Sequence, residues 1–368
     1  MTRKIFAREG GAMLVTMSVL LLLIVCLAAV AVDVGHLMIV RNELQNAADA
    51  AALAGANCLD KTSAPSGTDC TATTQPTLNW AVASAKASSA IALNKADGTT
   101  LASATVATGY KNLSGTPAGL QPATLSPITA NDRPAVMVTV SRSAGVNGGP
   151  VQTLVTNMFG GAAVPVSAQA IAVISAPGNV PPGNLIPQAI NQCMFNLYWN
   201  SATNSPQLAT SATLNGVPQT IGQPWELRIG SSYHYPNCDS GQWTSFNQDA
   251  NSQSAIKGLI ANGNPDPMNI GDNTWIEPGT KTASYNDLLA RYPVPPGADV
   301  VLVVVNLPNG LNTQGATPIV AFAGFHIDDI QGGSNKYIQG HFITGGTVTG
   351  SSGSGTYYGS YTPPRLAQ

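Results

Sequence analysis

Histidines and their acidic neighbours are the residues of this chain whose types could do acid–base or metal chemistry. The four histidines are His36, His234, His326 and His341. His326 is followed by Asp328 and Asp329, and an imidazole beside a carboxylate can transfer protons or bind a metal ion. Histidines at strand ends and aspartates in turns are common structural features, however, so we expect no catalytic, cofactor or metal site. The alternative is an envelope hydrolase that uses His326 and Asp329, which would need a nucleophile in a cleft beside them.

Two further clusters could bind a ligand. The stretch Asn262–Asp272 (NGNPDPMNIGD) carries oxygen atoms suited to calcium, but it lacks the acid spacing of an EF-hand. Four aromatic residues near Cys238 could form a recognition patch or pack around a disulfide: Tyr233, Tyr235, Trp243 and Phe246. No GxSxG, HExxH, P-loop or strand-bound GxGxxG motif occurs, so nucleotide hydrolysis would require another protein.

The five cysteines are divided between an apolar segment and the remainder of the chain. Cys26 lies within the apolar segment, whereas Cys58, Cys70, Cys193 and Cys238 follow it. An even number of cysteines in an oxidising compartment predicts two disulfides, and four cysteines allow three pairings. Proximity in sequence favours Cys58 with Cys70 and Cys193 with Cys238. Free thiols are the alternative, and the absence of CxxC and HxxxH spacings argues against zinc.

The composition indicates a secreted or envelope protein. Only 9% of the 368 residues are charged, against about a quarter in ordinary soluble domains, and the net charge is −2. So few cations cannot form the basic face that nucleic acids need. The 37 glycines and 26 prolines favour turn-rich β structure over a helical bundle.

The first structural element of the chain is an apolar segment near the N-terminus. Residues 12–32 (AMLVTMSVLLLLIVCLAAVAV) carry no charge, and about 20 apolar residues suffice to cross a bilayer. Three cations precede the segment: Arg3, Lys4 and Arg8. Cations that flank a span stay in the cytoplasm. We therefore expect a cytoplasmic N-terminus at residues 1–11, a transmembrane helix at 12–32, and the rest of the chain outside.

A cleavable secretory signal is the alternative for the same segment. Its apolar core would be Met13–Leu27, and Ala29-Val30-Ala31 matches the small-x-small cleavage pattern. Helical periodicity continues past this point without a helix breaker, which favours an uncleaved span. Either interpretation exports the rest of the chain.

The helical pattern continues beyond the bilayer as a membrane-emergent helix at residues 33–56. Five residues recur at steps of three and four on one face: Leu37, Val40, Leu44, Ala47 and Ala51. We expect one rod from Gly11 to Ala54, of which about half stands outside the membrane. Its alanine-rich face either docks on the chain's own domain or packs into other subunits, because small side chains permit close helix approach.

The run from Gly11 to Ala56 closely resembles the N-terminal signature of TadG-like (TadE/TadG-type) proteins of the bacterial tight-adherence (Flp) pilus machinery. The positions that carry the resemblance include Asp33, Gly35, Leu44, Gln45, Asn46, Asp49 and Gly55. The segment Ile270–Lys281 (IGDNTWIEPGTK) also resembles the C-terminal half of some TadG-like proteins. The resemblance implies an inner-membrane-anchored pilus-assembly component that faces the periplasm.

Two departures limit what the resemblance implies. Pilins typically keep a glutamate five residues after the glycine of the processing site, and this chain, counted from Gly11, has Thr16 there. Prepilin-peptidase processing and incorporation as a major pilin are therefore not expected. Many TadG-like proteins also carry a von Willebrand-type domain with a DxSxS metal motif. This sequence has no DxSxS, so that metal-dependent adhesion site is not carried over.

The sequence after the membrane-emergent helix predicts an α+β protein of two domains. Residues 57–175 predict a pilin-like α+β domain with helices at 76–94 and 151–160 and strands at 104–110, 135–143 and 163–175. Residues 176–184, rich in proline and glycine, predict a linker. Residues 185–345 predict a β-rich periplasmic domain with strands at 225–230, 299–307, 319–327 and 336–343 and a helix at 252–263. Residues 346–368 predict a flexible tail.

These observations together predict a non-enzymatic scaffold or anchor, similar to a minor pilin, that assembles a tight-adherence pilus by protein–protein binding. Its expected partners are pilin-like subunits, the inner-membrane secretion complex and the membrane, with no cofactor and no nucleic acid. The alternative is a surface or pilus-tip adhesin that binds carbohydrate through the aromatic residues of 185–345, above all Trp243.

Overall fold

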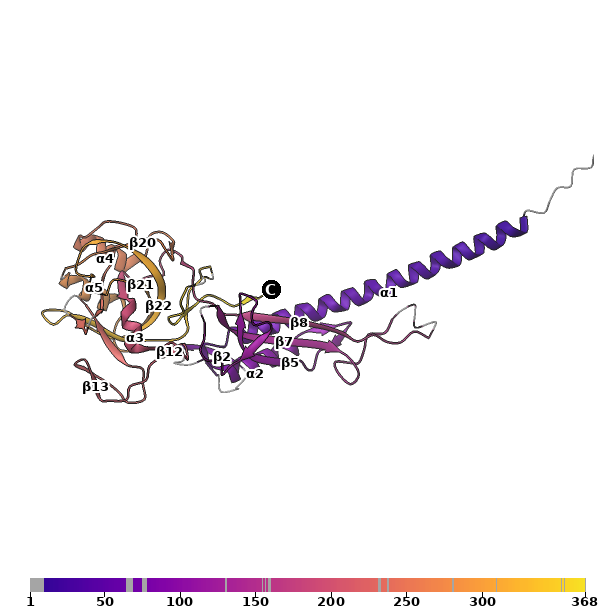
Figure 1. Cartoon of the computed structure of the whole chain (residues 1–368), viewed down its shortest axis with the longest axis horizontal. Coiled ribbons are helices and arrows are strands. Elements are labelled where there is room, and N and C mark those ends of the chain that lie inside the picture. The colour runs from indigo at the N-terminus through magenta and orange to yellow at the C-terminus, as the bar shows by residue number, and fades with distance from the viewer. Residues whose placement is uncertain are drawn as a thin grey trace, which may run out of the picture. The chain divides into compact units, whose positions relative to one another are not determined.

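The structure is a computed structural model that describes residues 10–63, 69–74, 78–129, 131–153, 155, 157, 160–230, 233–236, 238–279, 281–308, 310–351, 353 and 355–367 (Figure 1). Its helices are α1 (Gly10–Ala56), α2 (Trp80–Ile91), α3 (Phe195–Tyr198), α4 (Gln253–Asn262) and α5 (Thr282–Arg291), with a 3-10 turn, η2, at Gln192–Met194.

The strands of the first half are β1 (Lys61–Ser63), β2 (Cys70–Thr74), β3 (Lys95–Ala96), β4 (Thr99–Thr100), β5 (Thr105–Asn112), β6 (Leu120–Pro122), β7 (Asp132–Arg142), β8 (Val166–Val173) and β9 (Asn179–Val180). The strands of the second half are β10 (Gln188–Asn191), β11 (Trp199–Asn200), β12 (Ser205–Pro206), β13 (Thr213–Leu214), β14 (Val217–Pro218), β15 (Glu226–Ile229), β16 (His234–Tyr235), β17 (Cys238–Asp239), β18 (Gly241–Trp243), β19 (Met268–Asn269), β20 (Asn273–Ile276), β21 (Ala298–Val305), β22 (Gly315–Gln331), β23 (Tyr337–Phe342), β24 (Gly346–Thr347), β25 (Ser360–Tyr361) and β26 (Arg365–Leu366). Helices and sheets of this kind confirm the predicted α+β class.

The residues form two compact units, each described here by itself. The first comprises residues 1–51, 88–105 and 138–170, and the second comprises residues 52–87, 106–137 and 171–368. The domain limits expected from the sequence, at 57–175, 176–184 and 185–345, stay predictions.

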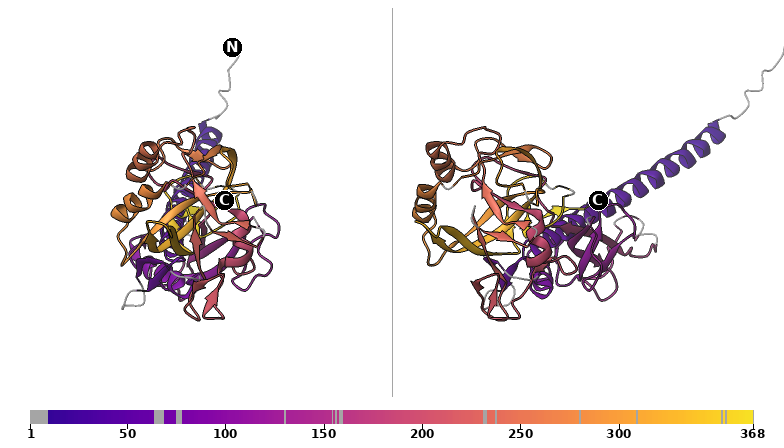
Figure 2. Two further views of the ribbon diagram at one scale, coloured as in Figure 1. Left: turned by 90° about the vertical axis from the view of Figure 1, so that its left-hand side faces the viewer. Right: turned by 60° about the vertical axis from the view of Figure 1, so that its left-hand side comes forward.

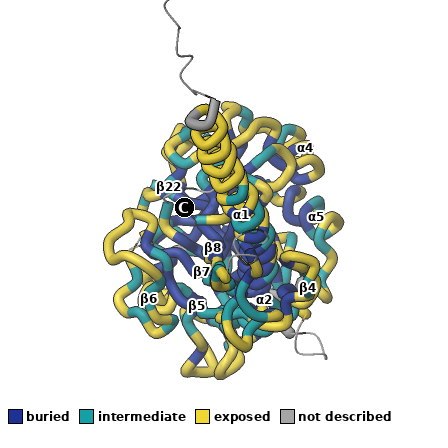
Figure 3. Tube along the Cα trace, turned by 90° about the vertical axis from the view of Figure 1, so that its right-hand side faces the viewer, coloured by how far each residue is buried: buried dark blue, intermediate teal, exposed yellow. Residues whose placement is uncertain are grey.

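Helix α1 is the longest element of the first unit, which includes its residues 10–51. It contains no proline, and its leucine, alanine, methionine, glutamate and glutamine residues are good helix formers, so the helix continues without interruption. Four of the five residues of the predicted stripe are at most 1% exposed: Val40, Leu44, Ala47 and Ala51. Figure 3 shows α1 changing from exposed to buried along its length. This face therefore docks on the chain's own fold, the first of the two alternatives.

A tight hairpin joins β3 and β4 in the same unit. Asp97 and Gly98 occupy its turn with φ angles of 52° and 71°. Positive φ at both central positions defines the type I′ turn that two-residue hairpins prefer, and Asp-Gly is one of its usual sequences. The hairpin thereby presents the Asp97 carboxylate at its tip.

A seven-stranded sheet organises the second unit. Its strand order is β15-β23-β22-β21-β10-β18, with β20 paired to β22. The pair β10–β21 is parallel and the other neighbours are antiparallel. Residues 300–305 of β21 are all buried, which explains why this central strand is apolar on both faces.

The C-terminal residues add strands rather than a free end to this unit. Strand β24 pairs with β25, and Arg365 and Leu366 of β26 pair with β8, so the C-terminus lies near β8 in Figure 1. Three tyrosines of this stretch are buried: Tyr357, Tyr358 and Tyr361. Glycine and serine richness suggested flexibility, but the aromatic residues between them pack. The predicted linker likewise contains β9, which pairs with β19.

The strongest sequence patterns match observed elements. The strands expected at 104–110, 135–143, 225–230, 299–307, 319–327 and 336–343 correspond to β5, β7, β15, β21, β22 and β23, and the helix expected at 252–263 corresponds to α4. The expected helix at 151–160 is different, because Val151 forms a β-bridge with Val164. Residues 154, 156, 158 and 159 of that segment lie outside the described residues.

Candidate functional site

The first half of α1 is apolar and exposed. The large apolar side chains from Met13 to Val32 are 50–72% exposed, and Figure 2 shows no other element beside this part of α1. Twenty helical residues span about 30 Å, the thickness of a hydrocarbon core. Within the described residues, α1 is the one helix long and apolar enough to cross a membrane. The exposed face is thus suited to lipid.

The hydroxyl groups of the two polar residues in the apolar stretch donate hydrogen bonds to backbone carbonyls of the same helix. Thr16 donates to the carbonyl of Met13 at 3.0 Å, and Ser18 donates to the carbonyl of Leu14 at 2.8 Å. In hydrocarbon a hydroxyl without a partner costs several kcal/mol, typically about 4–8. These bonds allow both residues to face lipid.

Burial on α1 begins at Asp33. Its side chain is only 4% exposed and accepts a hydrogen bond from the backbone N–H of Val155 at 2.9 Å. A buried carboxylate is stable only where donors satisfy it. Asp33 therefore attaches the segment around residue 155 to the helix, at the point where the expected span ends.

A charged network around Asp97 attaches the β3–β4 turn to α1. The Asp97 carboxylate accepts hydrogen bonds from His36 Nε2 at 3.0 Å and from Arg142 Nη1 at 2.7 Å. The backbone N–H of Asp97 donates to Glu43 Oε2 at 2.6 Å. His36, expected as an interfacial residue, is thus a structural partner of Asp97 within the first unit.

The remaining positions of the family-like signature have distinct structural roles. Gln45 donates to Asp49 Oδ1 at 2.8 Å and to the carbonyl of Gln169 at 3.1 Å, whereas Asn46 is exposed. Gly35 has no atom near the position where a Cβ would lie. At Gly55 a Cβ would lie 2.8 Å from both the Ala83 carbonyl oxygen and the Ala87 Cβ. Gly55 therefore permits the close approach of α1 and α2 within the second unit.

The two helical glycines predict opposite effects of the same substitution. Gly55→Ala should lower the free energy of unfolding by about 1–3 kcal/mol, since the new methyl group overlaps a backbone oxygen. Gly35→Ala should raise it by about 0.5–1 kcal/mol, because alanine is the better helix former and the site is open. Thermal unfolding of the full chain in detergent micelles measures both. Equal shifts in Tm would contradict the close approach at Gly55.

The structure contains the two disulfides favoured by sequence proximity. Cys58 is bonded to Cys70, 12 residues away, and Cys193 to Cys238, 45 residues away. Cys26 is a free, exposed cysteine in the apolar half of α1. The second disulfide joins the η2 turn to β17. Because α3 directly follows η2, this bond also holds the start of α3 near β17.

An acid–histidine row crosses one face of the seven-stranded sheet. Cross-strand pairing places Asp299 opposite His326, His326 opposite His341, and His341 opposite Glu226. His326 Nδ1 lies 2.6 Å from Asp299 Oδ1, and His341 Nδ1 lies 2.6 Å from Asp328 Oδ2. A bulge between Ile327 and Asp329 shifts the register of β22 here. Bulges of this kind re-aim side chains.

His326 and Asp329, which the hydrolase alternative would use, are not paired in this row. His326 pairs with Asp299 and approaches Asp328 at 3.8 Å, whereas Asp329 accepts a hydrogen bond from Tyr337 at 2.8 Å. Among the described residues no group of three or more histidine, cysteine or acidic side chains could hold a metal ion. The row is suited to proton binding.

Proton binding at His326 predicts a pH-dependent stability. The hydrogen bond to Asp299 raises the pKa of His326 above its usual 6.5, so the folded state holds this proton more tightly. The resulting stabilisation is complete below about pH 6.5 and is lost as pH rises through the folded pKa. We expect less than about 1 kcal/mol, because the pair is partly exposed. Denaturant titrations at several pH values should show this loss, and Asp299→Asn should abolish it. The same pH slope in that variant would contradict the assignment.

The aromatic and calcium candidates are structural residues. Trp243 is 1% exposed and packs edge-on against Tyr285, and Tyr235 and Phe246 are also buried. In the 262–272 segment, Asn264 Oδ1 accepts from two backbone N–H groups, and Asp272 Oδ2 accepts from Asn269. Tyr235, Trp243 and Phe246 are therefore core residues and do not form an exposed recognition patch.

Comparison with known proteins concerns the N-terminal part of the chain. Residues 10–57 match the family model described as Flp pilus-assembly TadE/G-like, and residues 54–172 match the model described as Tad-like Flp pilus-assembly. No curated protein and no solved structure matches the chain. The signature positions from Asp33 to Gly55 all fall within the first matched stretch.

Proposed function

Over residues 10–172 the chain belongs to the TadE/G-like Flp pilus-assembly family, and on this premise we propose that it is a single-pass inner-membrane anchor whose exported part binds other pilus-assembly proteins. The family as a whole is generally non-catalytic. The proposed action is therefore binding rather than a reaction, and the partners are pilin-like subunits and the inner-membrane secretion complex.

The contrast between the two halves of α1 is the observation that carries this proposal. Large apolar side chains are exposed up to Val32, and burial begins at Asp33. A helix that served only as the core of a soluble protein would bury its apolar residues throughout. The continuous stretch in which every large apolar side chain is at least 50% exposed ends at Val32, the last residue of the expected span, and this supports an anchor. The cations before the span support a cytoplasmic N-terminus.

The outer face of the emergent helix offers the surface for a partner. We define this face by exposed residues at steps of four: Val34, Met38, Asn42, Asn46 and Ala50. Met38 and the adjacent Ile39 are 61% and 59% exposed. Burying such a side chain contributes about 1.5–3 kcal/mol, so a partner helix that covers them gains affinity. Small and amide side chains farther along permit close approach.

Site-specific photocrosslinking in cells that assemble the pilus tests the proposal. A photoreactive residue at Met38 should capture a pilin-like subunit or a secretion-complex protein. The same residue at Leu44, which is fully buried in the chain's own fold, is the matched control and should capture neither. Failure of Met38, Asn42 and Asn46 alike to yield such a partner would refute binding through the outer face.

A further inference from the structure

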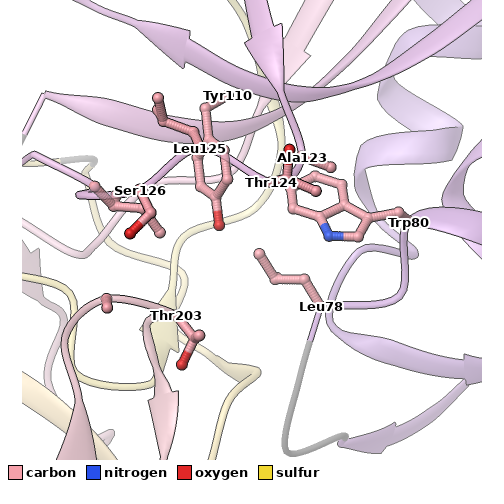
Figure 4. Close-up of a pocket in the computed structure, with 10 residues that line it drawn as sticks. Leu78, Trp80, Tyr110, Ala123, Thr124, Leu125, Ser126 and Thr203 are labelled. Carbon is pink, nitrogen blue, oxygen red and sulfur yellow. The ribbon is translucent and has the colours of Figure 1, made fainter.

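A small cavity in the second unit has aromatic walls and a hydroxyl-bearing rim (Figure 4). Its volume is about 260 Å³. Leu78 and Trp80 at the start of α2, Tyr110 of β5, and Leu125 and Ile128 supply the apolar surface. The rim carries the hydroxyl groups of Thr124, Ser126 and Thr203. Among the described residues that line it, none is charged.

Tyr110 and Trp80 direct polar atoms into this space. Tyr110 is only 3% exposed, and its hydroxyl points into the cavity in Figure 4. Burial raises the pKa of Tyr110 to about 12, so the phenol stays protonated and can donate. The Trp80 indole packs edge-on against the Tyr110 ring at 5.4 Å, with its N–H on the cavity side. Buried tyrosine and tryptophan usually find a partner for these groups.

We propose that the cavity between Trp80, Tyr110 and Thr203 binds one ring of a neutral carbohydrate. Drug-sized ligands occupy about 300–1,000 Å³, so this smaller cavity suits a single sugar ring. The apolar face of such a ring packs on aromatic side chains, and its hydroxyls exchange hydrogen bonds with phenol, indole and alcohol groups. The uncharged lining favours a neutral ligand. An acidic or cationic ligand would lose its hydration in the cavity and find no opposite charge there.

This inference is independent of the anchoring function, and its site differs from Trp243, the residue that the adhesin alternative depends on. That residue is buried among core side chains and has no surface for a sugar. The Trp80 cavity lies instead between the α2–β5 region and the loop at residues 202–203. The rival occupant is an apolar side chain of a partner protein, which would use the aromatic walls but not the phenol and indole groups that point into the cavity.

Ligand-detected NMR on the full chain tests the proposal, in a detergent that carries no sugar headgroup. The probes are glucose, galactose, mannose, N-acetylglucosamine, and the β-1,4-linked dimers of glucose and of N-acetylglucosamine. We expect saturable binding of at least one probe. Tyr110→Phe should weaken it about five- to tenfold through loss of one hydrogen bond, and Trp80→Ala should weaken it about tenfold or more.

Trp275→Ala is the matched control, because Trp275 is also a half-buried tryptophan of the second unit but does not line the cavity. It should leave the affinity unchanged. Circular dichroism monitors folding, and Thr203→Val at the exposed rim replaces Trp80→Ala if that variant unfolds. Absence of saturable binding for every probe would overturn the proposal. So would binding that survives both cavity variants, or a crosslink from Thr203 to a partner protein without any sugar binding.

Discussion

Two arginines in the apolar half of α1 should release the protein from the membrane. Leu21→Arg and Ile24→Arg together change the centre of the exposed stretch. Each arginine costs about 2.5–3.5 kcal/mol at a bilayer centre, and each lost apolar side chain removes about 0.5 kcal/mol. The total, about 6–8 kcal/mol, exceeds what the remaining apolar residues can offset. After an alkaline carbonate wash of membranes, the variant should therefore leave the pellet almost completely, whereas the unchanged chain should stay there.

The matched control places the same charges on exposed apolar residues outside α1. Leu93 and Ile221 are 86% and 66% exposed, so Leu93→Arg with Ile221→Arg should not alter the membrane-bound fraction. Retention of the Leu21/Ile24 variant in the washed pellet would contradict an anchor formed by α1. The intact mass of the unchanged protein distinguishes an uncleaved anchor from a cleaved secretory signal. A cleaved signal would leave a soluble chain that begins near Val32.

Patterns within short stretches of sequence correctly predicted several helices and strands of the structure. Steps of three and four residues predicted the buried face of α1, and runs of β-branched residues predicted β5, β7, β21 and β22. These signals lie within one element, so they need no knowledge of the fold. The apolar run of residues 300–305 even indicated a central position in the sheet, which β21 occupies.

Features that depend on contacts between distant residues could not be predicted in this way. Asp97 joins His36 and Arg142, which are 61 and 45 residues away along the chain. His326 is paired with Asp299, 27 residues earlier, whereas the sequence indicated only the near neighbours Asp328 and Asp329 as possible partners. The sequence left open whether Trp243 packs in the fold or binds a sugar, and its packing against Tyr285 places it in the core.

The C-terminal stretch shows that amino-acid composition alone does not predict whether a segment packs. Its glycines and serines are typical of flexible segments, and they predicted a tail at residues 346–368. Stacking of Tyr357 on Tyr361, with ring centroids 4.0 Å apart, provides an apolar contact that average composition does not register. A few aromatic side chains in a polar segment can therefore decide whether it packs.

Removal of the Cys193–Cys238 disulfide should destabilise the part of the chain after α1 more than removal of the Cys58–Cys70 disulfide. Its loop of 45 residues is the longer of the two, and loop-closure entropy assigns it about 4 kcal/mol, against about 3 kcal/mol for the 12-residue loop of Cys58–Cys70. Paired alanine substitutions at each disulfide should therefore lower the urea midpoint of the full chain, and the Cys193/Cys238 pair should lower it more.

Packing at the two bridges strengthens the expected order. The Cys193 bridge holds the turn that precedes α3, and Phe195 of that helix stacks on Phe342 of β23 with ring centroids 4.2 Å apart. Loss of the bridge thus loosens a core contact as well as freeing the unfolded chain. Tryptophan emission in urea, recorded for the unchanged chain and both double variants, measures the midpoints. Cys26→Ala, which removes the free thiol of the apolar helix, should leave the midpoint unchanged. A larger loss for the Cys58/Cys70 variant would show that loop length does not determine the stability of this protein.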